Sequence, residues 1–127
     1  MEIVNMGYTN YWHQKRSFTD AEWKQLTEEY DYLKDCGRIE PYDKNPDQIA
    51  FNAKGNGCET FVLNKNLDEY FKSEHMGSYY KEKYEKDGNH FDFCKTRMFP
   101  YDIDVWHMLT VARIVSPDNI TEISRDR

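Results

Sequence analysis

Two stretches of the sequence concentrate side chains that could bind an anionic ligand. The first pairs Asn52 with Glu59 on either side of a glycine-rich segment, and the second runs from Cys94 to Asp102. Within the second stretch a predicted strand ends and a predicted helix begins, and free backbone amides and the helix dipole attract anions at such a place. Cations and a hydroxyl group in the same stretch would add donors. The candidate ligand-binding residues are therefore Asn52, Glu59, Lys95, Arg97, Tyr101 and Asp102.

The same residues also have a purely structural interpretation. Asp102 would cap the helix, Lys95 would pair with Glu59, and Tyr101 would pack against the core. Charged networks of this kind often serve structure alone, even where they perturb the pKa values of their members. The sequence leaves both interpretations open.

Catalytic arrangements in the sequence are incomplete. Asp47, Glu59, Asp92 and Lys95 superficially resemble the carboxylate and lysine set of a metal-dependent nuclease, but two residues rather than one separate Asp92 from Lys95. A two-metal site also requires clustered carboxylates. We therefore expect no catalytic residue, and a carboxylate- and lysine-dependent hydrolase or nuclease is the alternative to a binding protein.

The cysteines and histidines do not form a recognisable metal motif. Cys36, Cys58 and Cys94 are odd in number and fit no disulfide framework, which is typical of a reducing compartment. No pair of cysteines has the two-residue spacing of a structural zinc site, and the four histidines are scattered. We expect neither a bound metal nor a cofactor.

Composition and charge restrict the classes of partner. The chain has 127 residues, of which 39% are hydrophobic and 16% aromatic, and this predicts a folded domain rather than a disordered chain. A net charge of −6 argues against general nucleic-acid binding, because such proteins need a basic surface. No apolar run is long enough to cross a membrane, and the first five residues do not resemble a secretion signal. We expect a soluble protein in the cytoplasm.

A helix over about residues 20–35 is the strongest local prediction. Thr19 and Glu22 have the spacing of a capping box, in which each side chain bonds to the backbone amide of the other residue. Gly37 is placed to end the helix in a left-handed conformation. Apolar residues complete the pattern as a hydrophobic staple and then a helical stripe, namely Phe18, Trp23, Leu26, Tyr30 and Leu33.

The remaining periodic segments predict strands and one more helix. A turn at residues 54–57 joins two of the strands into a hairpin. Pro100 is placed at the first position of a second helix, which Ser116-Pro117 ends. In the last regular strand we expect Phe91 and Phe93 to face the core. The predicted strands cover residues 7–14, 48–52, 58–63 and 90–95, with a further one at 120–123.

These elements predict an α+β fold, with a mostly antiparallel sheet of about four to five strands and two main helices packed on one face. We expect residues 1–127 to form a single domain. Residues 65–89 interrupt the pattern, because lysines and glutamates dominate them, and we interpret them as an insertion or a mobile excursion with some helix. We expect their rings to pack back onto the sheet, and a stacking surface is the alternative.

A pattern along the chain resembles a family of uncharacterised small proteins from bacteriophages and prophages. The pattern consists of Phe51-Asn52, a glycine turn, Glu59-Thr60-Phe61, Phe93-Cys94-Lys95-Thr96, Pro100-Tyr101-Asp102 and Val105. The similarity covers most of the chain outside residues 65–89, where this sequence carries an insertion. Residues 97–99 also depart from the family's more basic version of that segment. The resemblance implies an accessory protein in the cytoplasm of an infected host cell, and it implies no activity.

We therefore expect a small accessory protein that binds a host protein or a small anionic, nucleotide-like ligand without catalysing a reaction. An acidic, aromatic-rich domain without a catalytic motif fits this function. A homo-oligomer is a third option, because exposed rings in residues 65–89 would supply an interface.

Overall fold

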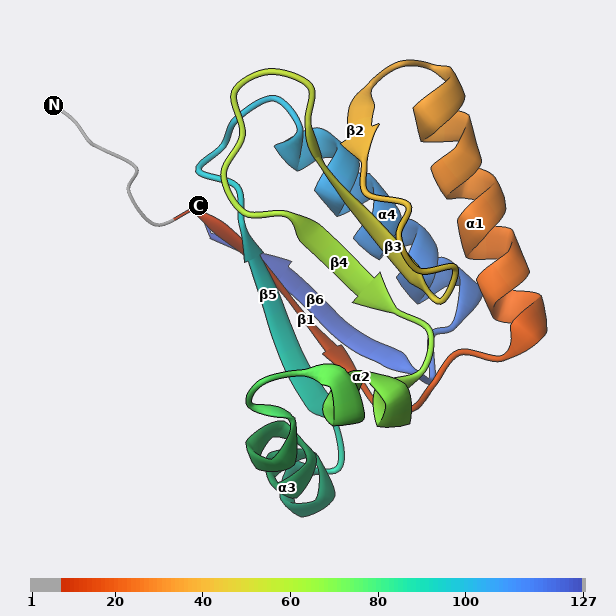
Figure 1. The fold of residues 1–127 in the computed structure, drawn as a ribbon, viewed down its shortest axis with the longest axis vertical. Helices are drawn as coiled ribbons and strands as arrows, with labels where there is room; N and C mark the ends of the chain where they lie inside the picture. Colours follow the sequence, from red (N-terminus) through yellow and green to blue (C-terminus); the bar gives the residue numbers. More distant parts are fainter. Residues whose placement is uncertain (1–7, 127) are drawn as a thin grey trace, which may run out of the picture.

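The structure is a computed structural model that describes residues 8–126 of the chain. Gly7, at which the first predicted strand begins, lies outside these residues. The described part contains six strands and four helices (Figure 1). In chain order they are β1 (Thr9–Gln14), α1 (Asp20–Asp35), β2 (Ile39–Pro41), β3 (Gln48–Ala53), β4 (Phe61–Asn64), α2 (Leu67–Ser73), α3 (Gly77–Asp87), β5 (His90–Lys95), α4 (Asp102–Val115) and β6 (Ile120–Arg125).

The strands form two antiparallel sheets of three strands each. One sheet has the order β5-β1-β6 and the other has the order β2-β3-β4. The α+β class is confirmed, whereas the expectation of one sheet with four to five strands is wrong. The chain before β4 meets the end of β5, where the Glu59 amide donates to the Lys95 carbonyl oxygen at 3.0 Å. From there the two strands diverge, so no hydrogen-bonded ladder joins the sheets in the described chain (Figure 1).

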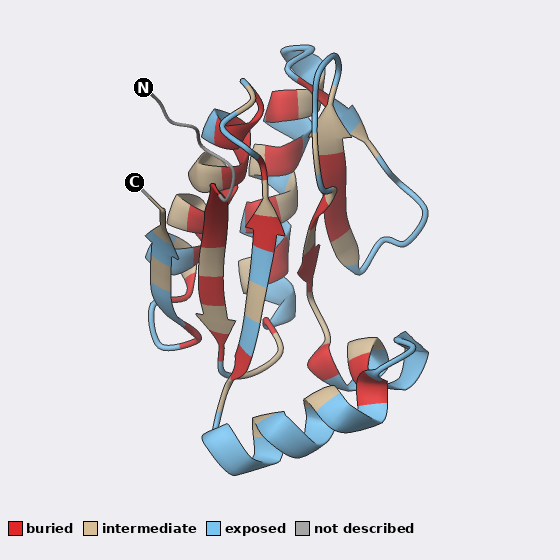
Figure 2. Ribbon diagram, turned by 90° about the vertical axis from the view of Figure 1, so that its left-hand side faces the viewer, coloured by how far each residue is buried: buried red, intermediate tan, exposed pale blue. Residues whose placement is uncertain are grey.

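A single hydrophobic core connects the two sheets with the two long helices. Three rings bridge the sheets: the centroid of Phe61 lies 5.4 Å from that of Trp12 on β1 and 5.2 Å from that of Phe51 on β3. α1 packs against α4, and α4 lies behind the sheet β5-β1-β6 in Figure 2. None of the helices within residues 8–126 is both long enough and apolar enough to span a membrane.

α1 begins and ends as the sequence predicts. The Glu22 amide donates to the Thr19 hydroxyl at 3.1 Å, and the Thr19 amide donates to the Glu22 carboxylate at 2.9 Å, which completes the capping box. The rings of Phe18 and Trp23 lie 5.6 Å apart, as a hydrophobic staple requires. Gly37 follows the helix with φ at +70°, where a side chain would be strained.

An ion-pair network that the sequence did not reveal connects α1 to the end of α4. The Arg16 guanidinium donates to both oxygens of Glu22, at 3.0 and 3.1 Å, and to Asp118 at 3.0 Å. The Ser116 hydroxyl donates to Glu22 at 2.8 Å. Glu22 therefore completes the capping box of α1 and also connects this helix to the residues at the end of α4.

The inward and outward sides of β5 are the reverse of the prediction. Phe91 and Phe93 are 50% and 51% exposed, so the expectation that they face the core is wrong. His90 and Cys94 are buried instead. Alternation along a strand tells which residues share a face, but it does not tell which face meets the core. Here the core covers Cys94, and the rings of α2 and α3 enclose His90.

Helices α2 and α3 occupy most of residues 65–89. Tyr70, Phe71 and Tyr80 pack around His90, with ring centroids 5.2 to 5.9 Å away. The Tyr84 hydroxyl donates to the carbonyl oxygen of Lys15 at 2.7 Å. Most of the rings in this segment therefore pack onto the rest of the chain, as expected, while Tyr79 is 52% exposed.

Several elements differ from the prediction in their presence or their bounds. β2 was missed, because a strand of three residues that contains Pro41 resembles a loop in the sequence. β4 begins at Phe61 rather than at Cys58, so the connection after β3 is longer than a tight hairpin turn. α4 begins at Asp102, and Pro100 lies in the turn before it.

Replacing Glu22 by Gln should destabilise the protein at neutral pH. The Arg16 guanidinium bonds to the ionised carboxyl of Glu22 and lowers its pKa from 4.5 to about 2. A lowered pKa stabilises the fold above the unfolded-state value, and this stabilisation disappears as the pH falls from 4.5 to about 2. We expect Glu22→Gln to cost about 2–3 kcal/mol at neutral pH and to flatten the pH dependence in that window.

Urea unfolding at a series of pH values measures both effects. Glu28→Gln is the matched control, because Glu28 is exposed on the same helix, and it should change the free energy of unfolding by less than about 0.5 kcal/mol. Equal losses in the two variants would contradict the role of Glu22.

Candidate functional site

Several of the predicted ligand-binding residues do come together, where the chain before β4, the end of β5 and the start of α4 meet. The Tyr101 hydroxyl donates to the Glu59 carbonyl oxygen at 2.6 Å and accepts from the Cys58 amide at 3.2 Å. The Glu59 carboxylate accepts from the Lys95 backbone amide at 2.8 Å. The partner of Glu59 is therefore the backbone of Lys95 and not its ammonium group.

Asn52 holds the loop between β3 and β4. Its side-chain amide donates to the Cys58 carbonyl oxygen at 3.2 Å and to the Thr60 hydroxyl at 3.1 Å. A Cβ atom at position 57 would lie 2.3 Å from the Asn52 side-chain oxygen, so a larger residue there would displace the Asn52 side chain. Asn52 and Gly57 thus fix the shape of the loop, and the polar groups of Asn52 are occupied within the chain.

Asp102 lies at the centre of a buried network. One carboxylate oxygen accepts from the Asn10 side-chain amide at 2.7 Å and from the Thr96 hydroxyl at 2.6 Å. The other oxygen pairs with the Arg125 guanidinium, which lies 4.6 Å from the Trp106 ring. The bonds of Asp102 go to side chains of β1, β6 and the end of β5, so this residue connects the sheet to α4.

The backbone amides at the start of α4 are engaged by the preceding turn. The Asp102 amide donates to the Phe99 carbonyl oxygen at 2.8 Å, and the Asp104 amide donates to that of Tyr101 at 2.9 Å. The sequence interpretation assigned these amides to an anion. In the folded chain they have partners already, so the helix start by itself offers little to a ligand.

Lys95 lies on the outward side of β5 with the two exposed phenylalanines, and Arg97 is exposed in the turn after it, so neither is shown to contribute its side chain to this junction. Arg97 has a φ of 55°, a left-handed conformation that is uncommon for a residue with a side chain. Asp92 lies on the inward side of β5, so Asp92 and Lys95 of the hydrolase alternative lie on opposite faces of one strand.

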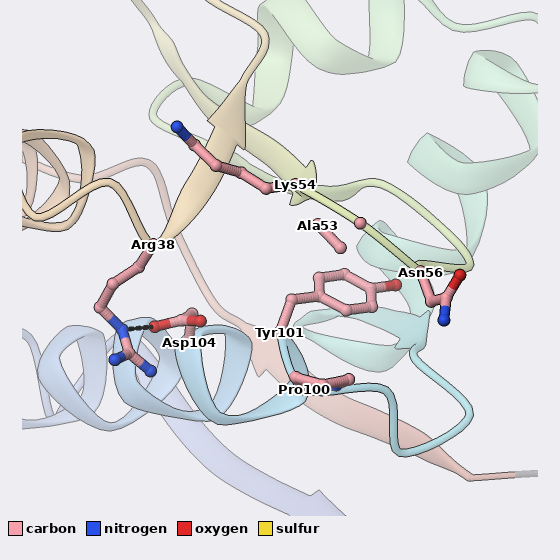
Figure 3. A pocket seen from close by; sticks show the side chains of 8 residues that line it. Arg38, Ala53, Lys54, Asn56, Pro100, Tyr101 and Asp104 are labelled. Carbon is pink, nitrogen blue, oxygen red and sulfur yellow. Dashed lines mark hydrogen bonds and ion pairs between the residues drawn. The ribbon is translucent and has the colours of Figure 1, made fainter.

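A pocket of about 310 Å³ lies beside the junction, between the β3–β4 loop and the first turn of α4 (Figure 3). In Figure 3 the Arg38–Asp104 pair is at one end, Tyr101 and Ala53 are in the middle, and Asn56 is at the other end. Lys54 also lines the pocket, with its ammonium group pointing away from Tyr101. Of the predicted residues only Tyr101 lines this pocket.

The Arg38 guanidinium is held in place by a buried carboxylate. Its Nε donates to Asp104 Oδ1 at 2.6 Å, and the Asp104 side chain is 5% exposed. The Nη1 and Nη2 groups of Arg38 have no hydrogen-bond partner among residues 8–126. Asp104 raises the pKa of Arg38, so the guanidinium is charged at every accessible pH. A fixed cation with unused donors thus lies at one end of the pocket.

Sequence reasoning missed Arg38 and Asp104 as a pair. Each had a local signal: Arg38 follows the glycine that ends α1, and Asp104 lies in the first turn of α4, where an acid complements the helix dipole. Their contact joins residues 66 positions apart. No local pattern predicts such a contact.

His90 and Asp92 form a second cluster of titratable groups, on the inward side of β5. Burial lowers the pKa of His90 to about 4 and raises that of Asp92 to about 7, with further raising from Glu74 and Glu59. The His90 Nε2 lies 3.9 Å from Asp92 Oδ2, too far for a hydrogen bond. His90 is uncharged at neutral pH and acts as a packed ring rather than as a proton carrier.

Comparison of the chain with protein-family models, with curated proteins and with solved structures finds no match. Within residues 8–126, no three His, Cys, Asp or Glu side chains are grouped so that they could hold a metal ion. The functional interpretation therefore depends on the geometry of the chain itself.

Replacing Asp102 by Asn should destabilise the fold strongly. An Asn side chain has one carboxamide oxygen, so either the Arg125 guanidinium meets the new NH2 group or the Asn10 and Thr96 donors do, and the partly buried guanidinium loses its counter-charge. Breaking a buried pair by changing one partner typically costs about 3–5 kcal/mol. Chemical unfolding measures this loss. The exposed Asp87→Asn is the control and should cost less than about 0.5 kcal/mol; a similarly small loss in Asp102→Asn would refute the structural role.

Replacing Asp92 by Asn should stabilise the protein in mild alkali. A raised folded-state pKa means that stability is complete below the unfolded value of 3.8 and is lost as the pH rises to about 7. The Asp92 side chain is still 24% exposed. We therefore expect Asp92→Asn to raise the free energy of unfolding by only about 1–2 kcal/mol at pH values above the folded-state pKa, and not at all near the unfolded-state pKa. Unfolding curves recorded near the unfolded-state pKa and above the folded-state pKa of Asp92 test this. Asp35→Asn, on the exposed end of α1, is the control and should change the free energy of unfolding by less than about 0.5 kcal/mol.

Proposed function

We propose that this protein is a non-catalytic binding protein that holds a small anionic ligand in the Arg38 pocket. The observation that carries the proposal is the Arg38 guanidinium, which the buried Asp104 fixes through Nε and whose two Nη groups have no hydrogen-bond partner among residues 8–126. Planar guanidinium groups bind carboxylate and phosphate through two parallel hydrogen bonds. An arginine that is already held in place loses less conformational entropy when it binds.

The charges around the pocket favour an anion. Asp104 balances the single positive charge of Arg38, and Lys54, which has no ion-pair partner among residues 8–126, leaves the pocket lining with one net positive charge. Asn56 offers an amide group at the other end of the pocket. The pocket is therefore a locally positive place in a chain of net charge −6.

The size and walls of the pocket favour a small ligand. A volume of about 310 Å³ is at the lower end of the range for ligand pockets. Ala53, Pro100 and the Tyr101 ring supply apolar surface for the uncharged part of the ligand. The negative net charge repels long polyanions, whereas one phosphate or carboxylate group needs only the local field. A nucleotide-like molecule combines such an anionic group with an apolar ring.

The resemblance to small bacteriophage proteins suggests a setting for this function. An accessory protein that binds an anionic metabolite or signal would act in the cytoplasm of the host cell and would need no catalytic group. Neither the hydrolase alternative nor a metal-dependent reaction receives support from the positions of Asp92 and Lys95.

Isothermal titration with inorganic phosphate and with adenosine monophosphate tests the proposal. We expect the nucleotide to bind more tightly than phosphate, and Arg38→Gln to weaken its binding by about ten- to a hundredfold, the value of one to two charge-assisted hydrogen bonds. The affinity should also fall as salt is added.

Lys24→Gln is the matched control, because Lys24 is an exposed cation on α1 outside the pocket. It should leave the affinity unchanged. The proposal fails if neither anion binds at millimolar concentration, or if Arg38→Gln and Lys24→Gln bind alike.

A further inference from the structure

One side of the sheet β5-β1-β6 is covered by no helix within the described chain. Figure 2 looks onto this side and shows α4 behind the three strands. We call it the open face. By alternation along the paired strands, its side chains are Phe91, Phe93 and Lys95 of β5, Thr9, Tyr11 and His13 of β1, and Glu122, Ser124 and Asp126 of the β6 segment.

Aromatic rings fill the β5 and β1 part of the open face. Phe91 stacks on Tyr11 with centroids 5.9 Å apart, and it also contacts His13 at 5.2 Å and Phe93 at 6.2 Å. Phe91 and Phe93 nevertheless keep about half of their surface in water. Full burial of a phenylalanine contributes about 1.5–3 kcal/mol. Covering the exposed halves of Phe91 and Phe93 would therefore favour binding of a partner substantially.

Carboxylates flank the rings on the β6 side. Glu122 lies beside His13, with 3.6 Å between the Glu122 Oε1 and the His13 Nδ1, and its side chain is 68% exposed. Asp126 lies beside Tyr11 and accepts a hydrogen bond from its hydroxyl at 3.2 Å. A group that stacks on rings and pairs with carboxylates at the same time would match both halves of this surface. Guanidinium is such a group.

The area of the open face limits the size of its occupant. Three strands about 4.8 Å apart, each contributing about five residues at about 3.3 Å, span on the order of 250 Å². A stable interface between two folded proteins buries about 800 Å² on each partner. The open face is therefore too small to hold a second copy of this chain by itself, and its size suits an extended segment.

We propose that the open face docks an extended, arginine-bearing segment of a partner protein. The guanidinium groups lie flat on Phe91, Phe93 and Tyr11 and pair with Glu122 and Asp126. This surface is separate from the Arg38 pocket, so the two binding functions are independent of each other.

Single-stranded RNA is the other occupant that a sheet with exposed rings could accept, because bases stack on such rings. The charges on the open face are unfavourable for RNA. Glu122 and Asp126 would repel the phosphates, and Lys95 is the sole cation among its nine side chains. The observations therefore favour the peptide, and RNA becomes one outcome of the test.

Fluorescence anisotropy with a short labelled peptide that alternates arginine and serine tests the proposal. We expect this peptide to bind about three- to tenfold more tightly than its lysine counterpart, because guanidinium stacks on rings better than ammonium does. Phe91→Ser/Phe93→Ser should weaken binding by at least about tenfold. Glu122→Gln should weaken it by about threefold and reduce its salt dependence.

Three comparisons separate this result from nonspecific binding to exposed apolar side chains, from loss of folding and from binding at the Arg38 pocket. Ile114→Ser removes an aliphatic side chain that is 73% exposed on α4, and it should leave binding unchanged. Glu122→Gln changes an exposed position and keeps the fold, so it tests the open face even if the double phenylalanine variant unfolds. Arg38→Gln should bind the peptide normally, which distinguishes this surface from the anion pocket.

Three outcomes would overturn the proposal. Equal affinity for the arginine and lysine peptides would show that charge alone drives binding. Tighter binding of a short oligouridine, lost in the double phenylalanine variant, would assign the face to RNA. A dimer in light scattering that the same variant abolishes would assign it to a second copy of the chain.

Discussion

The burial of one carboxylate, that of Asp102, is the constraint on which most of this structure depends. An ionised group in the interior is tolerated only when every part of it is paired. Asp102 meets this condition by drawing Asn10, Thr96 and Arg125 to a single point at the start of α4. These partners lie on β1, after β5 and on β6, so satisfying one charge aligns the whole sheet with the helix that packs on it.

The position of α4 determines in turn where the pocket lies. Because Asp102 anchors the first turn, Tyr101 is held with its hydroxyl against the chain before β4, and Asp104 is directed towards Arg38. The buried network and the exposed pocket thus both depend on the position of the first turn of α4. The Asp102 carboxylate is paired at both oxygens and holds the helix start in place, whereas the Nη groups of Arg38, unpaired among residues 8–126, are available to a ligand.

The division into two sheets explains why the molecule has a second surface. Rings of Trp12, Phe51 and Phe61 fill the space between the sheets, and the two long helices cover the core from one side. Nothing in the described chain covers the outward side of β5-β1-β6, where Phe91 and Phe93 are exposed. The aromatic content of the chain therefore has two separate uses, one in the core and one on the open face.

The sequence by itself determined the features that depend on neighbours along the chain. The capping box of Thr19 and Glu22, the stripe of α1 and the extent of β5 follow from local hydrogen bonding and periodicity, and all three are present. Only the tertiary structure decided which side of β5 meets the core, that the strands separate into two sheets, and that Asp102 pairs inwardly while Arg38 faces the pocket. These outcomes depend on contacts between residues far apart in sequence, such as Asn10 with Asp102 and Arg38 with Asp104. Which of these contacts form depends on burial and charge pairing summed over the whole chain. No single segment of the sequence contains that information.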